Sequence, residues 1–341
     1  MNENYPSLNE WKRLYEVALE FREIGCWEWM TDDYIFGVQN PETDEIGYCC
    51  VIGNLGEVFG LIVYTGSKGL ASYLKIITLQ NPEGNFDNML LQECLSITFE
   101  DRRYLEKEDL KVIKDLGFKF RGRNAYPLFR NLKPGYYPWF ITREEARFLI
   151  VVFQQALDVC QRFKYDKTLL IPPVKGQYFV RVPQIIEGGL SWRDEWMWPQ
   201  PLQPEEFTPI RADELRLQRI KSNAVQQGIW EFDYFYANMP VKEEGRPYFP
   251  MTLLIVDSAS GFILHARVST PLKYQREFTD SFISFVEEAG ILPKELLVAK
   301  DEAMKILEPV ISCLKIKLTK VKRCKEVEKA QRSFSRFTSR R

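Results

Sequence analysis

Histidine and cysteine, the side chains that most often bind metals or act as nucleophiles, are sparse in this sequence. His265 is the single histidine, which excludes a zinc site built on several histidines and leaves one residue for any histidine-dependent catalysis. It lies within an expected strand, 262–268, where a packed or edge histidine is the expected role. Seven cysteines occur without a CxxC pair, at 26, 49, 50, 94, 160, 313 and 324. Their odd number and apolar surroundings indicate buried thiols in a reducing cytoplasm.

Basic side chains gather near the end of the chain. Residues 315–341 hold eleven Lys or Arg and two acids, Glu326 and Glu328, although the net charge of the whole chain is -1. Such a segment can bind the phosphates of nucleic acid. The residues expected to do so are Lys317, Lys320, Lys322, Arg323, Arg332 and Arg336. The alternative is a solvated helix face followed by a fraying end.

Segment 191–201 combines three tryptophans with two prolines. The tryptophans are Trp192, Trp196 and Trp198. They could form a stacking platform for bases or bind a partner protein, or they could seal a linker against a domain. Because 341 residues exceed what one core usually serves, we expect two domains, 1–203 and 215–341, joined by a linker over 204–214.

The pattern of the first domain is typical of an α+β fold. Two capping boxes, Ser7 with Glu10 and Thr142 with Glu145, predict the starts of two helices, of which the second is long and apolar. The residues from 27 to 79 are expected to form short strands. The other expected elements include the strands 46–52, 58–64, 95–100 and 178–182 and the helix 106–116. The glycines at 53 and 56 lack the spacing of a phosphate-binding loop and predict a plain turn.

The second domain shows a more informative order of elements. A short leading helix precedes three strands, which we expect to form an antiparallel meander. Helices and two further strands then alternate. The expected strands are 229–236, 249–256, 262–268, 296–299 and 316–321, and the expected helices are 277–289, 302–314 and 324–337. The order β-β-β-α-β-α-β-α predicts an α/β domain with a five-stranded mixed sheet.

This order resembles the RNase H-like fold shared by ribonuclease H, retroviral integrases and DDE transposases, over residues 213–338. The segment Trp230-Glu231-Phe232-Asp233 is similar to the first-strand aspartate segment of integrases. Residues 254–261 resemble their second-strand turn, and Val298-Ala299-Lys300-Asp301 resembles the fourth-strand aspartate segment. The whole chain also resembles a bacterial two-domain family of unknown function.

The resemblance implies a site for two Mg²⁺ ions, because clustered carboxylates repel one another unless a cation neutralises them. Carried over by position, Asp233 and Asp301 would bridge the metals, and Glu326 or Glu328 would be the third ligand. Glu277 is a further candidate. The sequence departs from the integrase pattern, since a glutamate rather than a glycine follows Asp301, and no histidine or asparagine accompanies the acids. The alternative is that Asp301 caps the helix that follows it.

Three functions follow from these patterns. We expect a non-catalytic binding or regulatory protein of the bacterial cytoplasm, built on an RNase H-like module, with a nucleic-acid or protein partner. The alternative is a Mg²⁺-dependent nuclease or strand-transfer enzyme that uses Asp233, Asp301 and Glu326 or Glu328. A third possibility is a structural interaction protein whose working part is the first domain. No apolar run reaches the about 18–20 residues that span a bilayer, so we expect no membrane partner.

Overall fold

The computed structural model describes residues 4–78, 86–202, 213–243 and 245–338, without the side chains of Met89 and residues 334–338. The chain divides into two compact units, Met1–Pro134 with Pro138–Gln203 and Gly135–Tyr137 with Pro204–Arg341. We call them the N-terminal and the C-terminal unit. Most of the expected linker, 204–214, lies outside the described residues.

A mixed seven-stranded sheet forms the centre of the N-terminal unit, with the strand order β5-β4-β3-β2-β1-β6-β7. Neighbouring strands are antiparallel, except that β1 and β6 are parallel. The strands are β1 Ile35–Gln39, β2 Ile46–Ile52, β3 Phe59–Thr65, β4 Cys94–Glu100, β5 Tyr126–Leu132, β6 Tyr178–Ile186 and β7 Gly189–Met197.

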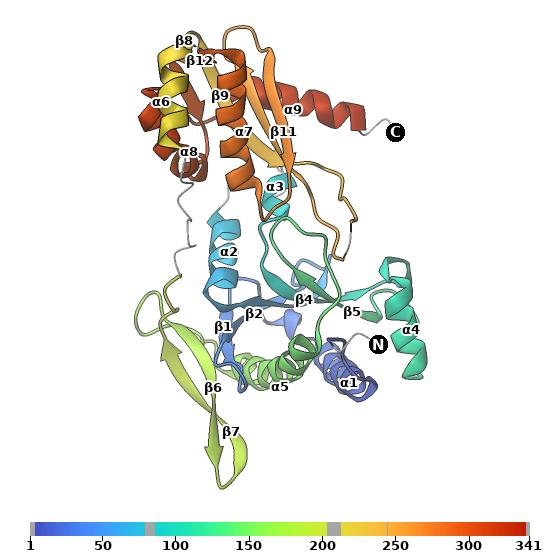
Figure 1. Cartoon of the computed structure of the whole chain (residues 1–341). Helices are drawn as coiled ribbons and strands as arrows, with labels where there is room; N and C mark the ends of the chain where they lie inside the picture. The colour runs from blue at the N-terminus through green and yellow to red at the C-terminus, as the bar shows by residue number, and fades with distance from the viewer. Residues whose placement is uncertain (1–3, 79–85, 203–212, 244, 339–341) are drawn as a thin grey trace. The chain divides into compact units, whose positions relative to one another are not determined.

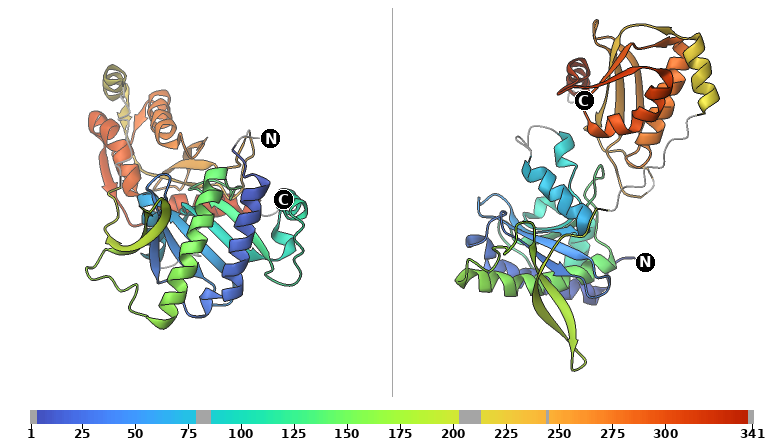
Figure 2. Two further views of the ribbon diagram at one scale, coloured as in Figure 1. Left: turned by 90° about the horizontal axis from the view of Figure 1, so that it is seen from below. Right: turned by 90° about the vertical axis from the view of Figure 1, so that its left-hand side faces the viewer.

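Helices cover both faces of this sheet (Figure 1). The long helices α1 and α5 lie side by side on one face, as Figure 2 shows, and enclose the larger core. Helix α2 covers the other face through a smaller cluster that includes Tyr48, Leu70 and Tyr73. The helices are α1 Leu8–Ile24, α2 Gly66–Thr78, α3 Phe86–Met89, α4 Lys107–Asp115 and α5 Arg143–Tyr165, with 3-10 turns at Cys26–Glu28 and Arg102–Tyr104.

Both expected capping boxes are confirmed. The Ser7 hydroxyl accepts from the Glu10 N–H at 3.3 Å, and the Glu10 carboxylate accepts from the Ser7 N–H at 2.7 Å. Thr142 and Glu145 make the same reciprocal bonds at 3.2 and 2.8 Å. Burial disfavours the ionised Glu10 carboxylate, but hydrogen bonds from Ser7 and Arg147 outweigh this effect and lower the pKa of Glu10 to about 2.

Two elements of the N-terminal unit differ from expectation. Most of the tryptophan segment forms strand β7, in which Trp192 and Trp196 pack against the main core, and Trp198, which follows the strand, is 57% exposed. The charged residues between the tryptophans obscured the period of two that marks a strand. Residues 66–78 form helix α2 rather than a strand, although two glycines in its first turn lower its helix propensity.

The C-terminal unit is built on a five-stranded mixed sheet with the order β11-β10-β9-β13-β14. Strands β9, β10 and β11 form the expected antiparallel meander, whereas β13 is parallel to β9 and β14 is parallel to β13. The strands are β9 Ile229–Tyr236, β10 Met251–Asp257, β11 Ile263–Ser269, β13 Glu295–Val298 and β14 Lys317–Lys320, with a separate parallel pair of β8 Val225–Gln226 and β12 Ile291–Leu292.

Of the helices in the described part of this unit, three pack on one face of the sheet and a fourth packs on the other (Figure 2, right). They are α6 Glu214–Asn223, α7 Tyr274–Ala289 and α8 Asp301–Leu314 on the first face, and α9 Lys325–Thr338 on the second. His265 is packed as expected, since its ring stacks on Phe285 with the centroids 5.0 Å apart.

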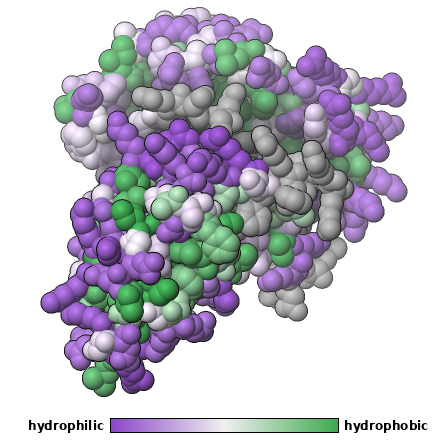
Figure 3. Space-filling model, turned by 90° about the horizontal axis from the view of Figure 1, so that it is seen from above, coloured by the Kyte–Doolittle hydropathy of each residue, from purple (hydrophilic) through white to green (hydrophobic). Residues whose placement is uncertain are grey.

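One face of the molecule is drawn by hydropathy in Figure 3. On the face drawn in Figure 3, hydrophilic residues predominate and hydrophobic residues form smaller separate groups. Among the described residues, no helix combines the length and apolarity needed to cross a membrane.

A nearly buried ion pair joins helix α4 to strand β5. Arg130 donates to both carboxylate oxygens of Asp109, at 2.9 and 2.6 Å, and its guanidinium lies 4.8 Å from the centre of the Phe140 ring. The two side chains are 9% and 12% exposed. Removing one member of such a pair leaves a charge that has lost both its partner and most of its water.

We expect Arg130→Met to lower the free energy of unfolding by about 3 kcal/mol, because the Asp109 carboxylate stays at a largely buried position without its partner. Urea denaturation measures this change. A matched control is Arg13→Met, which breaks the exposed pair with Glu16 at 3.7 Å and should cost less than about 1 kcal/mol. Equal losses for the two variants would contradict the structural role of Arg130.

Candidate functional site

Aromatic and acidic side chains alternate along residues 230–234 of strand β9. Successive residues of a strand point to opposite faces of the sheet. Trp230, Phe232 and Tyr234 belong to the core beneath α6, α7 and α8. The alternate residues Glu231 and Asp233 therefore point toward the face that α9 covers. Both carboxylates belong to the segment whose resemblance to integrases motivated the metal-site prediction.

Glu231 is a buried carboxylate that caps helix α9. It is 4% exposed, and its Oε2 accepts from the N–H groups of Glu326 at 2.8 Å and Val327 at 3.0 Å. The first N–H groups of a helix have no partner within the helix, and the positive end of the helix dipole favours a negative charge there. Glu231 therefore fixes the start of α9 on the central strand of the sheet.

Asp233 is paired with a lysine. Its Oδ1 lies 2.9 Å from Lys300 Nζ and also accepts from the Tyr234 N–H at 2.8 Å. The Lys300 ammonium donates to the Tyr234 carbonyl oxygen and lies 4.5 Å from the centre of the Tyr234 ring. Lys300 thus contacts charge, carbonyl and ring together, at the point where strand β13 leads into helix α8.

Asp301 points elsewhere. It is the first residue of α8, its side chain is 74% exposed, and its carboxylate pairs with Lys320 of strand β14. The hydrogen bond and the charge of Lys320 lower the pKa of Asp301. The expectation that Asp301 caps α8 is wrong, because Lys300 occupies the N-cap position and makes no side-chain capping bond.

The expected third ligands have their own partners. Glu326 Oε1 lies 2.6 Å from Lys329 Nζ. Its other oxygen, Oε2, lies close to Gly261, since a Cβ placed on that glycine would be only 3.1 Å from it. Glu328 accepts from Arg323 Nε at 2.7 Å, and this bond lowers the pKa of Glu328. Glu277 belongs to α7, which packs on the opposite face of the sheet from α9.

The acids are therefore dispersed into separate pairs. Asp233 and Asp301 each face a different lysine, and Glu326 and Glu328 each face a cation on or beside α9. Within the described ranges, no group of three or more His, Cys, Asp or Glu side chains is arranged to hold a metal ion. The arrangement supplies protein cations to the carboxylates that the metal-site prediction assigned to Mg²⁺.

The first part of the chain matches a known protein family. Residues 11–181, half of the sequence, match the family described as "Domain of unknown function (DUF7309)". The chain belongs to the DUF7309 family. In this DUF7309 protein, residues 216–335 also match a second domain of unknown function, DUF6930. No curated protein matches the sequence.

Solved structures give only a distant likeness. The Mos1 transposase in its paired-end complex with the left transposon end is 11% identical, covers 64% of this chain and has a TM-score of 0.19. The Mos1 strand transfer complex is 8% identical, covers 64% of this chain and has a TM-score of 0.18. The DUF7309 protein spans 59% and 58% of those transposase chains, less than two thirds. TM-scores of this size carry no argument about function.

The basic residues predicted to bind nucleic acid lie in strand β14, in the connection that follows it and in α9, and most are paired with acids. Lys317 pairs with Glu295 at 2.9 Å, and Arg332 lies 3.7 Å from Glu328. Lys320 and Arg323 have the partners given above, whereas no ion pair is described for the exposed Lys322 in the part of the chain that the structure covers. The Arg336 side chain lies outside the described residues.

Sequence reasoning missed the residues that organise this site, which are Glu231, Lys300 and Glu302. Glu302 accepts from the Tyr234 hydroxyl at 2.9 Å and from Gln275 Nε2 at 2.8 Å, and it also accepts from the Tyr274 hydroxyl. The alternation of strand 229–236 could have placed Glu231 beside Asp233 on one face. Nothing in the sequence shows that the start of helix α9 lies against the Glu231 carboxylate.

We expect Glu231→Ala to lower the free energy of unfolding by about 2–3 kcal/mol, because two N–H groups at a buried helix start lose a charged acceptor. Glu231→Gln should cost less, since its amide oxygen can still accept. Urea denaturation gives the size of the change, and hydrogen exchange at the amides of residues 326 and 327 locates it. Glu328→Gln is the control, because its exposed pairs are worth less than about 1 kcal/mol. Unchanged exchange at these amides would contradict the capping role.

Proposed function

We propose that the C-terminal unit of this protein is an RNase H-like module that binds a partner and does not carry out metal-dependent catalysis. The strand order β11-β10-β9-β13-β14 supports the fold assignment, together with the antiparallel meander followed by two parallel strands. The described helices lie on both faces of this sheet, with α9 on one face and α6, α7 and α8 on the other, which also supports the proposed layering. In keeping with the cysteine pattern, the proposal places the protein in the cytoplasm.

The ion pair between Lys300 and Asp233 carries the proposal that the module is non-catalytic. In a two-metal site, divalent ions neutralise the carboxylates at the strand ends and bind the reacting phosphate. Here an ammonium group 2.9 Å from Asp233 Oδ1 already provides a positive charge. A Mg²⁺ ion at Asp233 would have to displace Lys300 from its carboxylate, carbonyl and ring contacts. The alternative function, a nuclease that uses Asp233 and Asp301, needs that displacement.

We propose nucleic acid as the partner, bound through its phosphates. Between residues 315 and 332, eight Lys or Arg side chains accompany two acids. Lys315, Lys322 and Lys325 are exposed, and no acidic partner is described for them within the covered residues. Phosphate contacts of exposed lysines do not select a base sequence, so the expected binding is weakly sequence-dependent and strongly salt-dependent. The exposed pairs of Lys320 and Arg323 can exchange their carboxylate for a phosphate at little cost.

A thermal-shift titration tests the non-catalytic role. A site with a dissociation constant of about 0.1 mM would add about 2.7 kcal/mol to stability at about 10 mM metal, whereas we expect no Mg²⁺- or Mn²⁺-dependent rise in the Tm of the wild type. Two variants are titrated beside the wild type. Lys300→Met removes the positive charge that faces Asp233 and keeps a side chain of similar length, and Lys305→Met, on the exposed side of α8, is the control. A metal-dependent rise in the wild type that Asp233→Ala abolishes would establish the enzyme alternative.

A salt titration tests the nucleic-acid partner. We expect Lys322→Glu combined with Lys325→Glu to weaken binding of a duplex oligonucleotide at least about tenfold. The slope of log K against log salt should become less steep by the amount that corresponds to about two lost phosphate contacts. Fluorescence anisotropy at several salt concentrations measures both quantities. The control variant reverses the charges of Arg219 and Lys221, which lie on α6 on the other side of the sheet. The same affinity and slope for both double variants and the wild type would exclude this surface as the nucleic-acid-binding site.

A further inference from the structure

Strand β7 ends the sheet of the N-terminal unit, and among the described residues it pairs with β6 alone. The two strands are joined by Glu187 and Gly188, which both have positive φ angles, 52° and 79°. This two-residue loop is typical of a type I′ hairpin, in which the closing pair is hydrogen-bonded and bonded and non-bonded pairs then alternate. Pro183, which has no N–H, accordingly falls at a non-bonded position opposite Trp192.

The alternation determines which backbone groups of β7 face away from β6. Counted from the closing pair of Ile186 and Gly189, the odd-numbered residues of β7 bond to β6. The even-numbered residues Leu190, Trp192, Asp194 and Trp196 direct their N–H and C=O groups to the open side. An edge of this kind is a template for another strand unless side chains prevent pairing.

The charges of β7 are complementary to those of a second β7 in one register. Arg193 and Glu195 lie on the same face of the strand, with Arg193 Nη2 and Glu195 Oε1 2.6 Å apart. An antiparallel β7 pair related by a two-fold axis at Asp194 places each Arg193 opposite the Glu195 of the other copy. An axis at Arg193 or at Glu195 would instead place like charges directly opposite, which is destabilising.

We propose that β7 is a dimerisation edge, which pairs antiparallel with β7 of a second copy of this protein about an axis at Asp194. The outward-facing groups of residues 192, 194 and 196 form the hydrogen-bonded pairs, with Trp192 beside the Trp196 of the second copy. Arg193 and Glu195 then occupy the non-bonded pairs, where side chains approach most closely. The two N-terminal sheets become one continuous sheet.

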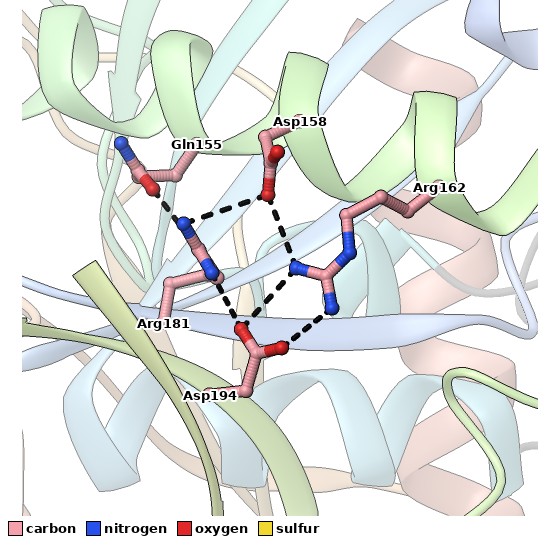
Figure 4. Close-up of polar contacts among 5 residues, drawn as sticks. All are labelled: Gln155, Asp158, Arg162, Arg181 and Asp194. Carbon is pink, nitrogen blue, oxygen red and sulfur yellow. Dashed lines mark hydrogen bonds and ion pairs between the residues drawn. The ribbon is translucent and has the colours of Figure 1, made fainter.

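The residue on the axis does not oppose this pairing, because its charge is already neutralised. The Asp194 carboxylate accepts from Arg181 Nη1 and from Arg162 Nη2, each at 2.5 Å (Figure 4). Burial disfavours its ionisation, but the hydrogen bonds from Arg162 and Arg181 outweigh this effect, and the pKa of Asp194 is lowered. Asp158 and Gln155 bind the same arginines, so that two carboxylates face two guanidinium groups.

This network also holds the edge in place before a partner arrives. Arg162 and Asp158 belong to α5, Arg181 belongs to β6 and Asp194 belongs to β7, so the contacts join all three elements (Figure 4). An edge that is ordered in advance loses less conformational entropy on binding.

Sedimentation equilibrium with charge reversal tests the dimer. Since β7 offers fewer residues than the about 20–30 a side of a standard interface, we expect a mass that rises from 40.2 kDa toward twice that value between about 1 and 200 µM. Arg193→Glu and Glu195→Arg should each weaken association at least about tenfold, because like charges then meet twice. The double variant should restore it, as should mixing the two single variants.

The control for these variants is Arg13→Glu, which breaks the exposed pair with Glu16 and makes the same change in net charge as Arg193→Glu. It should leave association unchanged, and the circular dichroism spectra of all variants should match that of the wild type. A wild type that stays monomeric over this range would overturn the proposal, and so would a double variant no stronger than the single ones.

A disulfide test locates the register. In a background with the exposed Cys313 replaced by serine, a mixture of the Arg193→Cys and Glu195→Cys chains should form a cross-linked dimer under mild oxidation. Non-bonded antiparallel pairs hold their Cα atoms about 4.5 Å apart, within the range of a disulfide. Neither chain alone should cross-link, since each cysteine then faces an unchanged residue. Equal cross-linking of the single chains and the mixture would overturn the axis at Asp194.

Discussion

The buried carboxylate of Glu231 determines how the second face of the C-terminal sheet is organised. It lies on the central strand β9 and accepts the first N–H groups of α9, so strand and helix meet at one charged contact. A carboxylate shielded from water requires partners, and the helix start provides two N–H donors together with a favourable dipole. The positions of Glu326 and Glu328 follow from this contact, because both belong to the first turn of α9.

The same principle of local neutralisation applies to the other acids of this face. Three carboxylates that the metal-site prediction brought together instead have separate cations: Lys300 for Asp233, Lys320 for Asp301 and Arg323 for Glu328. Mutual repulsion, which makes clustered carboxylates recruit divalent ions, is thereby reduced pair by pair. The RNase H-like fold proposed for this unit does not by itself require metal chemistry, since function resides in the side chains rather than in the fold.

The sequence predicts the C-terminal strands closely because their patterns are local. Strand 229–236 was expected with the bounds it has, and β10, β11, β13 and β14 differ from expectation by one or two residues at their ends. Helix starts at Ser7 and Thr142 were predictable because a capping box is written in four consecutive residues. Strand β7 was missed because three consecutive charges interrupt its tryptophans, and α2 because Gly66 and Gly69 weaken its helical pattern.

The partners of the acids could not be predicted, because each contact joins distant positions. Glu231 and Glu326 are 95 residues apart in sequence, and Lys300 meets Asp233 only after β13 aligns with β9. Asp301 lies next to Lys300 in the sequence, yet it turns toward a different strand. A strand-end position indicates where an acid can lie, but the direction of its side chain depends on the tertiary fold.

Helix α9 covers an apolar strip of the C-terminal sheet. It is the one helix described on its face, where Val327 and Cys324 pack on Phe235, Leu254 and Val256. A proteolytic cut in the short connection before residue 325 would release the helix and bare this apolar strip to water. Sheets with such a strip tend to self-associate. Helix α9 therefore contributes to the colloidal behaviour of the protein, apart from any ligand it holds.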